Sequence, residues 1–262
     1  MRTLAVIPAR YRSSRFPGKI LAEIAGRPMI EHVYNRTQSA KSVEEVIVAT
    51  DDPRIVTAVL GFGGQCLMTS PLHKSGTDRV AEVASELDAD LIVNVQGDEP
   101  LIDPQAIDQA VDACKENKGE AIASLRRAIT SGRELWDPNV VKVVTDARAL
   151  ALYFSRWPIP FVATKDMSPQ KLSRSFLETP APGDARLYKH IGLYVYPKPI
   201  LLELARTEPT ELEQREKLEQ LRALEHGIPI RVEVTEYDNI AVDTPEDLER
   251  VREMFAKGRK EL

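Results

Sequence analysis

The chain has 262 residues, which is enough for one large α/β domain with an embedded subdomain. Apolar residues make up 43% and charged residues 29%, an ordinary composition for a protein that folds in water. The net charge of −5 gives no general affinity for nucleic acid or anionic membranes, so any phosphate site has to be built locally from basic residues.

The cysteines and the beginning of the chain predict a soluble, cytoplasmic protein. Cys66 and Cys114 lie far apart, and two reduced structural thiols are favoured over a disulfide between them. The apolar run at 4–7 is too short for the core of a signal peptide. No apolar stretch approaches the length of a membrane span, so we expect no membrane partner.

Strand and helix signals alternate through the first half of the chain. Short apolar runs predict strands over 4–7, 46–49 and 91–95. Helices are predicted to begin at Pro28, to cover 76–87, and to begin again at Pro104 with Asp103 as the N-cap. This alternation favours a mostly parallel sheet with helices on both faces.

Three polar loops follow the predicted strands of this sheet, at 8–19, 50–53 and 96–100. In open α/β sheets, ligands bind outside the carboxyl ends of the strands. We therefore expect the three loops to converge on one crevice.

The second half of the chain has a different pattern. Strands are predicted over 140–144, 151–154, 191–196 and 228–236. Leucines and charged residues predict one helix over 210–226, and Thr244 is predicted to cap the last helix with Asp247 reaching back to it. The segment 161–187 has little periodicity and is predicted to be a long loop.

The loop after the first strand is rich in basic residues, with four cations among positions 10–19. Cations and backbone N–H groups beyond a strand end suit a triphosphate, although composition alone leaves a solvated surface loop equally open. The pattern is not the P-loop of GTPases and kinases, because Gly18-Lys19 lacks both the first glycine and the following hydroxyl.

This loop, IPARYRSSRFPGK followed by GRPMIEHV, resembles the signature of the 3-deoxy-manno-octulosonate (Kdo) cytidylyltransferases, or CMP-Kdo synthetases. Further blocks appear in the family's order: VIVATDD at 46–52, HKSGTDR at 73–79, VNVQGDEP at 93–100, ALYFSR at 151–156, YKHIGLYVY at 188–196, LEQLRALEHG at 218–227 and AVDTPEDLERV at 241–251. The resemblance covers nearly the full chain.

The resemblance implies a Rossmann-like, glycosyltransferase-A-like nucleotidyltransferase sheet with a smaller sugar-binding and dimerisation subdomain. The division it suggests is a nucleotide-binding part over 1–135, a subdomain over 136–236 and a C-terminal return over 237–262. It further implies a homodimer that transfers CMP from CTP to the anomeric hydroxyl of Kdo, releasing pyrophosphate and supplying lipopolysaccharide synthesis.

Two aspartates are implied by the resemblance to hold Mg²⁺ at the nucleotide phosphates. Asp98 follows a predicted strand, and Asp243 precedes the N-cap of the last helix. Without the resemblance, a turn residue and a favourable charge at a helix start would explain them equally plainly. Magnesium prefers hard oxygen ligands, commonly one or two carboxylates completed by water and phosphates.

The predicted catalytic residues are Lys19, Arg10, Asp98 and Asp243, with Lys19 placed on the reacting phosphate. The predicted nucleotide-binding residues are Pro8, Ala9, Arg10, Ser13, Arg15, Lys19, Ser75 and Gln96. Ser75 would serve equally well as a helix cap.

An acidic sugar needs a fixed cation for its carboxylate, and Arg156 is the leading candidate. His190 and Tyr194, four residues apart in a strand, point to the same face and are predicted to hydrogen-bond the sugar. By resemblance, Glu219 and Gln220 bind sugar hydroxyls. A satisfied, half-buried histidine and a solvated helix face remain the alternative interpretations.

Other activities stay open at this stage. The related possibilities are a cytidylyltransferase for sialic acid or amino-substituted Kdo, and a sugar-1-phosphate nucleotidyltransferase, although that class has a more glycine-rich first loop. A catalytically silent nucleotide-binding subunit is disfavoured, because the chain keeps Lys19, Asp98 and Asp243 together.

Overall fold

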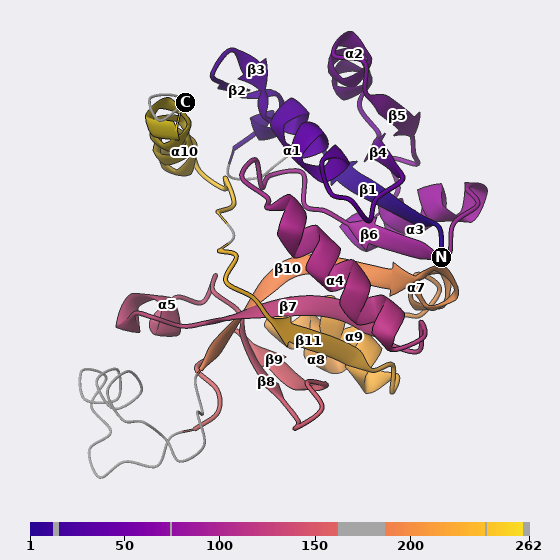
Figure 1. Ribbon diagram of the computed structural model, residues 1–262, viewed down its shortest axis with the longest axis vertical. Coiled ribbons are helices and arrows are strands. Elements are labelled where there is room, and N and C mark those ends of the chain that lie inside the picture. Colours follow the sequence, from indigo (N-terminus) through magenta and orange to yellow (C-terminus); the bar gives the residue numbers. More distant parts are fainter. Residues whose placement is uncertain (13–15, 74, 162–186, 239, 259–262) are drawn as a thin grey trace.

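The computed structural model describes residues 1–12, 16–73, 75–161, 187–238 and 240–258. Within these ranges one large sheet runs through the molecule (Figure 1). Its strands are β1 (Thr3–Ala9), β4 (Glu45–Thr50), β5 (Gln65–Met68), β6 (Leu91–Asn94), β7 (Ile122–Ala128), β8 (Lys142–Thr145), β9 (Ala151–Ser155), β10 (Tyr188–Pro197) and β11 (Ile230–Val234). A separate small hairpin joins β2 (Glu23–Ile24) to β3 (Arg27–Pro28).

The sheet has the order β11-β7-β10-β6-β1-β4-β5 and is mostly parallel. β1 runs parallel to β4 and β6, β4 is parallel to β5, and β11 is parallel to β7. β10 is antiparallel to β6 and β7, and it also pairs with the antiparallel β8–β9 hairpin. The predicted fold class, a mostly parallel α/β sheet with additions in the second half, is confirmed.

Helices cover both faces of the sheet (Figure 1). They are α1 (Met29–Gln38), α2 (Pro53–Gly61), α3 (Gly76–Glu86), α4 (Pro104–Glu116), α5 (Gly132–Trp136), α7 (Lys198–Leu204), α8 (Glu211–Glu216), α9 (Gln220–Glu225) and α10 (Pro245–Gly258), with a short 3-10 turn, η1, at Lys19–Leu21. Among the described residues, none of these helices is long and apolar enough to cross a membrane.

Alternation along β1 shows how the two cores are built. Ala5 and Ile7 pack with α1 and α4, whereas Leu4 and Val6 pack with α3 and α7 on the other face. All four side chains are fully or almost fully buried. The continuous apolar run in the sequence therefore marks a strand covered on both sides, which is the burial pattern of a parallel sheet.

The predicted helix starts are confirmed at the level of single hydrogen bonds. The Asp103 carboxylate accepts from the Gln105 backbone N–H at 2.9 Å and so caps α4. Thr244 Oγ1 accepts from the Asp247 N–H at 3.2 Å, and Asp247 Oδ2 accepts from the Thr244 N–H at 3.0 Å. This reciprocal pair begins α10 immediately after Asp243.

The prediction of one helix over 210–226 is wrong. The chain forms two short helices, α8 and α9, separated at Lys217, whose φ of 55° is left-handed. Arg156 stabilises the break, because its guanidinium donates to the carbonyls of Glu216 at 2.7 Å and Lys217 at 3.2 Å. The helices α2, α5 and α7, the strands β5 and β7 and the β2–β3 hairpin were not predicted.

Two other predictions have a simpler outcome. Cys66 and Cys114 are both free thiols, as expected. The predicted loop over 161–187 lies almost entirely outside the described residues. The division into 1–135, 136–236 and 237–262 stays a prediction, although the single sheet takes strands from the first two of these parts.

Candidate active site

A lysine joins two aspartates at the carboxyl end of the sheet. Lys19 Nζ donates to Asp98 Oδ2 at 2.6 Å, to Asp243 Oδ1 at 3.0 Å and to the Val242 carbonyl at 2.9 Å. Lys19 begins η1, Asp98 lies in the loop between β6 and α4, and Asp243 lies just before α10. Three segments that are far apart in the sequence thus bring their charged side chains to one point.

Two glycines let the backbone come close enough to form this cluster. Gly18 has a φ of 74° and turns the basic loop into η1 directly before Lys19. At Gly97, an added Cβ would lie only 3.0 Å from the Pro8 carbonyl oxygen. The Val242 N–H also donates to the Asp98 carbonyl at 2.9 Å, so backbone contacts fix the two aspartate-bearing segments together.

Lys19 keeps its positive charge in this position. Burial alone would lower the pKa of its ammonium group, but the charges and hydrogen bonds of Asp98 and Asp243 outweigh burial and raise that pKa. Because the group is only 8% exposed, its charge is compensated by the two carboxylates rather than by water. Lys19 is therefore a permanently charged, fixed cation over the whole physiological pH range.

The donor set around Lys19 fits a magnesium ion that is completed by its substrate. Asp98 and Asp243 face the same ammonium group, and their side chains are 27% and 39% exposed, so both carboxylates are accessible from solvent. Among the described residues there is no group of three or more His, Cys, Asp or Glu side chains with metal-binding geometry. A pair of carboxylates that relies on water and phosphate oxygens for the remaining ligands is characteristic of Mg²⁺ sites.

The basic loop is tied to the start of α3. Arg10 Nη2 donates to the carbonyls of Ser75 at 2.6 Å and His73 at 3.1 Å. The Ser75 hydroxyl accepts from the Asp78 N–H at 3.0 Å, so this side chain forms the helix cap that was its alternative interpretation. Ser13 and Arg15, two of the predicted nucleotide-binding residues, lie outside the described residues.

A cavity of about 330 Å³ opens where two of the predicted loops meet. Its lining residues are Arg10, Tyr11, Arg12, Asp51, Asp52, Pro71, His73 and Arg79. Together with the Lys19–Asp98 contact, this cavity shows that the loops at 8–19, 50–53 and 96–100 do meet at one edge of the sheet. The arginines give this side of the site its positive charge.

A second cavity, of about 220 Å³, lies on the side of β10 and α9. Its lining residues are Gly76, Thr77, Asn94, Gln96, Tyr194, Tyr196, Lys217, Leu218, Glu219 and Gln220. It brings together four of the predicted residues, Gln96, Tyr194, Glu219 and Gln220. The break between α8 and α9 allows this, because it carries Glu219 over to α3, where Thr77 donates to its carboxylate at 2.6 Å.

Two predicted sugar residues lie beside this cavity and not in its lining. His190 is buried, its Nε2 lies 2.8 Å from Ser124 Oγ, and burial lowers its pKa to about 3, so the ring is neutral. Arg156 donates to three backbone carbonyls, the third being that of Pro138 at 2.8 Å. The guanidinium therefore fixes the turn at Lys217, whose side chain does line the cavity.

Sequence reasoning missed several residues of the second cavity. Tyr196 lies two residues beyond Tyr194 in β10, so strand alternation would have put both rings on one face. The rings are stacked, with centroids 5.7 Å apart, and burial raises the pKa of both hydroxyls. Asn94 is the register partner of Tyr194 across β6, which only the strand pairing reveals.

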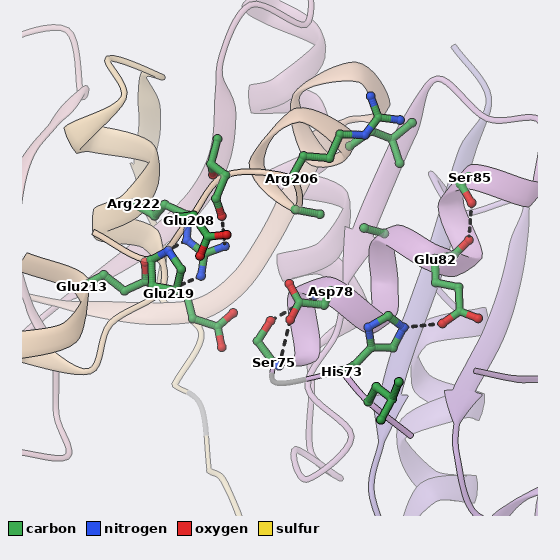
Figure 2. A pocket seen from close by; sticks show the side chains of 16 residues that line it. His73, Ser75, Asp78, Glu82, Ser85, Arg206, Glu208, Glu213, Glu219 and Arg222 are labelled. Carbon is green, nitrogen blue, oxygen red and sulfur yellow. Dashed lines mark hydrogen bonds and ion pairs between the residues drawn. The ribbon is translucent and has the colours of Figure 1, made fainter. Parts of the chain in front are cut away.

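A third cavity, of about 650 Å³, lies between α3 and the α7–α8 connection (Figure 2). Figure 2 shows Asp78 directed at Ser75, and His73 paired with Glu82. Five acidic residues line it, namely Asp78, Glu82, Glu208, Glu213 and Glu219. These carboxylates outnumber the arginines of the lining, Arg206 and Arg222, so the cavity does not suit a triphosphate.

Comparisons with known proteins agree on one family. Residues 4–233 match the family model described as cytidylyltransferase. The chain is 54% identical over 253 residues to the 3-deoxy-manno-octulosonate cytidylyltransferase of Geobacter sulfurreducens, covering 97% of this chain and 99% of that protein. It is 50% identical to the protein of the same name from Solibacter usitatus, with 97% and 94% covered.

Solved structures show the same relation. A CMP:2-keto-3-deoxy-manno-octonic acid synthetase complexed with CTP matches with a TM-score of 0.87 and 42% identity, over 98% of this chain and 100% of that one. A cytidylyltransferase from Leptospira borgpetersenii matches with a TM-score of 0.62 at 18% identity, over 98% of this chain and 87% of its own. At that identity the second match reports the fold alone.

Proposed function

The chain belongs to the cytidylyltransferase family, among the 3-deoxy-manno-octulosonate cytidylyltransferases, and we propose that it transfers CMP from CTP to Kdo. The anomeric hydroxyl oxygen of Kdo forms a bond to the α-phosphorus, and the bond from that phosphorus to the pyrophosphate oxygen breaks. The hydroxyl proton is released, and the products are CMP-Kdo and pyrophosphate. The product would serve lipopolysaccharide synthesis.

The observation that carries this proposal is the cluster of Lys19, Asp98 and Asp243, formed by loops that also contribute Arg10 and Gln96 to two cavities of different chemistry. One cavity is lined by three arginines and two aspartates, and its excess of arginines suits the nucleotide phosphates. The other is lined by hydroxyl, amide and carboxylate groups, which suits a polyhydroxylated sugar. A transfer from nucleotide to sugar requires both kinds of pocket, together with one cluster of charged side chains that acts on the reacting phosphate.

On this proposal Lys19 binds an oxygen of the reacting phosphate, where its fixed charge stabilises the negative charge that develops during transfer. Asp98 and Asp243 would hold Mg²⁺, which supplies charge neutralisation at the phosphates and lowers the pKa of the attacking hydroxyl. Arg10 would bind phosphate oxygens from the neighbouring loop. Placement and charge account for most of the catalysis, because phosphoryl transfer needs little covalent help from the protein.

Base selection would come from backbone groups near Pro8 and Ala9 and from Gln96, with the start of α3 at Ser75 close to the nucleotide. Kdo would bind in the second cavity through Tyr194, Glu219 and Gln220. His190 would act from beside the cavity, where its contacts with Tyr194, at a ring distance of 5.2 Å, orient that tyrosine. Arg156 would shape the turn that closes the cavity on one side.

The active protein is further proposed to be a cytoplasmic homodimer, with the interface on the 136–236 part. Support comes from exposed apolar side chains there: Leu152, Trp157 and Phe161 are 63%, 70% and 70% exposed. Large apolar groups gathered on one part of a surface mark interaction sites more often than free surface. Light scattering of the purified protein at several concentrations tests this, and a monomer at all of them would overturn it.

The proposed activity is tested by incubating the purified protein with Mg²⁺, CTP and an equimolar mixture of Kdo, amino-substituted Kdo and sialic acid. We expect pyrophosphate release with CMP-Kdo as the dominant product. A dominant CMP-sialic acid or CMP-amino-Kdo product would assign the chain to a different acidic sugar. Absence of all three products would favour a catalytically silent nucleotide-binding subunit.

A further inference from the structure

The ring of Tyr11, with Arg54 stacked on it, contacts the other end of the basic loop at Gly18. The guanidinium carbon of Arg54 lies 3.3 Å from the centroid of the Tyr11 ring. The Tyr11 side chain also borders Gly18, where an added Cβ would lie 3.1 Å from the Tyr11 Cζ atom. Arg54 belongs to α2, whereas Tyr11 and Gly18 belong to the loop between β1 and η1. The stack therefore joins a neighbouring helix to the loop that ends at Lys19.

The guanidinium that stacks on the Tyr11 ring is held in a defined orientation by Asp52. Its Nε and Nη2 donate to Asp52 Oδ1 and Oδ2 at 2.9 and 2.7 Å, a bidentate pair that fixes the guanidinium plane. Asp52 is itself the N-cap of α2 and accepts from the Arg54 N–H at 3.0 Å. The hydrogen bonds with Arg54 lower the pKa of Asp52, so the pair stays charged at neutral pH.

Tyr11 connects the stack to the residues predicted to bind phosphate. Its carbonyl accepts from the Gly18 N–H at 2.8 Å, which closes the loop, and Gly18 directly precedes Lys19. On the other side Tyr11 follows Arg10, whose guanidinium is bound to the carbonyls at the start of α3. A shift of the Tyr11 ring would thus be transmitted to Arg10 and to Lys19 together.

We propose that Arg54, oriented by Asp52, is a positioning residue for the nucleotide-binding loop. It lies over the Tyr11 ring, which also borders Gly18, and sets the loop geometry in which Arg10 and Lys19 meet the triphosphate. The inference rests on the proposed function in that CTP is the ligand of this loop. The sequence alone gives no sign of it, because Arg54 is just an exposed helix residue next to a capping aspartate.

The experiment compares Arg54→Gln with Arg27→Gln in the full-length protein. Arg27 is a matched control: it is 58% exposed against 57% for Arg54, it is paired with Glu31, and it lines none of the three cavities. We expect Arg54→Gln to raise the KM for CTP about three- to fivefold, the value of one exposed cation–π contact. The KM for Kdo and the melting temperature should stay close to wild type.

Two further variants separate positioning from a general effect of charge. Arg54→Lys keeps the charge but loses the planar bidentate pair, so it should restore less than half of the lost CTP affinity. Asp52→Asn should raise the KM for CTP as Arg54→Gln does, and the double variant should be no worse than either one. An additive double variant, or an Arg27→Gln effect of equal size, would overturn the proposal.

Limited trypsin digestion gives a readout that does not depend on the assigned reaction. If Arg54 holds the loop, Arg54→Gln should be cut after Arg12 at least threefold faster than wild type or Arg27→Gln. Equal cutting rates would contradict the positioning role even if the protein acts on a different sugar. Faster cutting together with no activity in the wild type would instead fault the proposed function and leave the stack intact.

Discussion

The two sides of the site solve different physical problems. On the nucleotide side, Lys19 is held between Asp98 and Asp243 by ion pairs of 2.6 and 3.0 Å, and arginines line the cavity where the loops at 8–19 and 50–53 meet. On the β10 side the groups are mainly neutral: His190 is buried, Tyr194 is partly buried, and both are uncharged. On the proposed function, charge stabilisation belongs to the first region and hydrogen-bond selection to the second, so substitutions in the two should affect different kinetic constants.

The largest expected effect of a single cation is at Lys19. Lys19→Met removes a fixed charge from the reacting phosphate and should lower kcat by roughly 100- to 1000-fold. The melting temperature should fall by only a few degrees, since both aspartates retain access to water. Pyrophosphate release and thermal unfolding of the same preparation measure both quantities. Parallel loss of activity and stability would reduce Lys19 to a structural ion-pair residue.

A smaller effect is expected on the other side, at Glu219. Glu219→Gln keeps the shape but weakens a hydrogen-bonding carboxylate in the sugar cavity, and should raise the KM for Kdo about tenfold, the value of one hydrogen bond. The KM for CTP should hardly change. Glu208→Gln is the matched control, because Glu208 lines only the acidic cavity behind α3. If Glu219→Gln changed the KM for CTP instead, the division between the two sides would fail.

His190 should contribute more to the pH dependence of stability than to activity. Its pKa is lowered to about 3 by burial, whereas the unfolded residue titrates near 6.5. The unfolded state therefore takes up a proton first as the pH falls, so the stability due to the neutral ring is present above pH 6.5 and is lost between 6.5 and 3. From pH 7 to 5, wild type should lose about 2 kcal/mol more unfolding free energy than His190→Asn.

Urea unfolding at the two pH values measures this difference. Equal losses in wild type and His190→Asn would mean that the ring is protonated in the folded protein. It would then be a charged group on the sugar side, and the contrast between a charged and a neutral region would be weakened.

How much could be predicted from sequence differs between the same two regions. The strand ends near Pro8, Asp51 and Gln96 were predicted to meet because apolar runs alternate with amphipathic helices, and the rule for parallel sheets then places the loops. The family resemblance implied that Asp98 and Asp243 act together, but the contact of Asp243 with Lys19, which spans 224 positions, is known only from the structure. Local pattern contains no information on such distances.

The sugar side was harder to predict because its geometry depends on long-range contacts. The turn at Lys217 contains no glycine from which it could be predicted. It is stabilised by Arg156, about 60 positions earlier, which donates to the carbonyls of Glu216 and Lys217. Arg156 was predicted to bind the sugar carboxylate. In the structure its guanidinium donates to three backbone carbonyls. Tyr196 and Asn94 could have been found by applying strand alternation and pairing to Tyr194.

The most direct test of the account is pyrophosphate release from CTP and Kdo by wild type and Asp98→Asn over a range of Mg²⁺ concentrations. Asp90→Asn, at an exposed position outside the three cavities considered above, serves as the control. We expect Mg²⁺-dependent release by wild type and the control, and a loss of at least roughly 1000-fold in Asp98→Asn with its melting temperature preserved. Undiminished, Mg²⁺-saturable release by folded Asp98→Asn would contradict the assignment of this cluster as the catalytic centre.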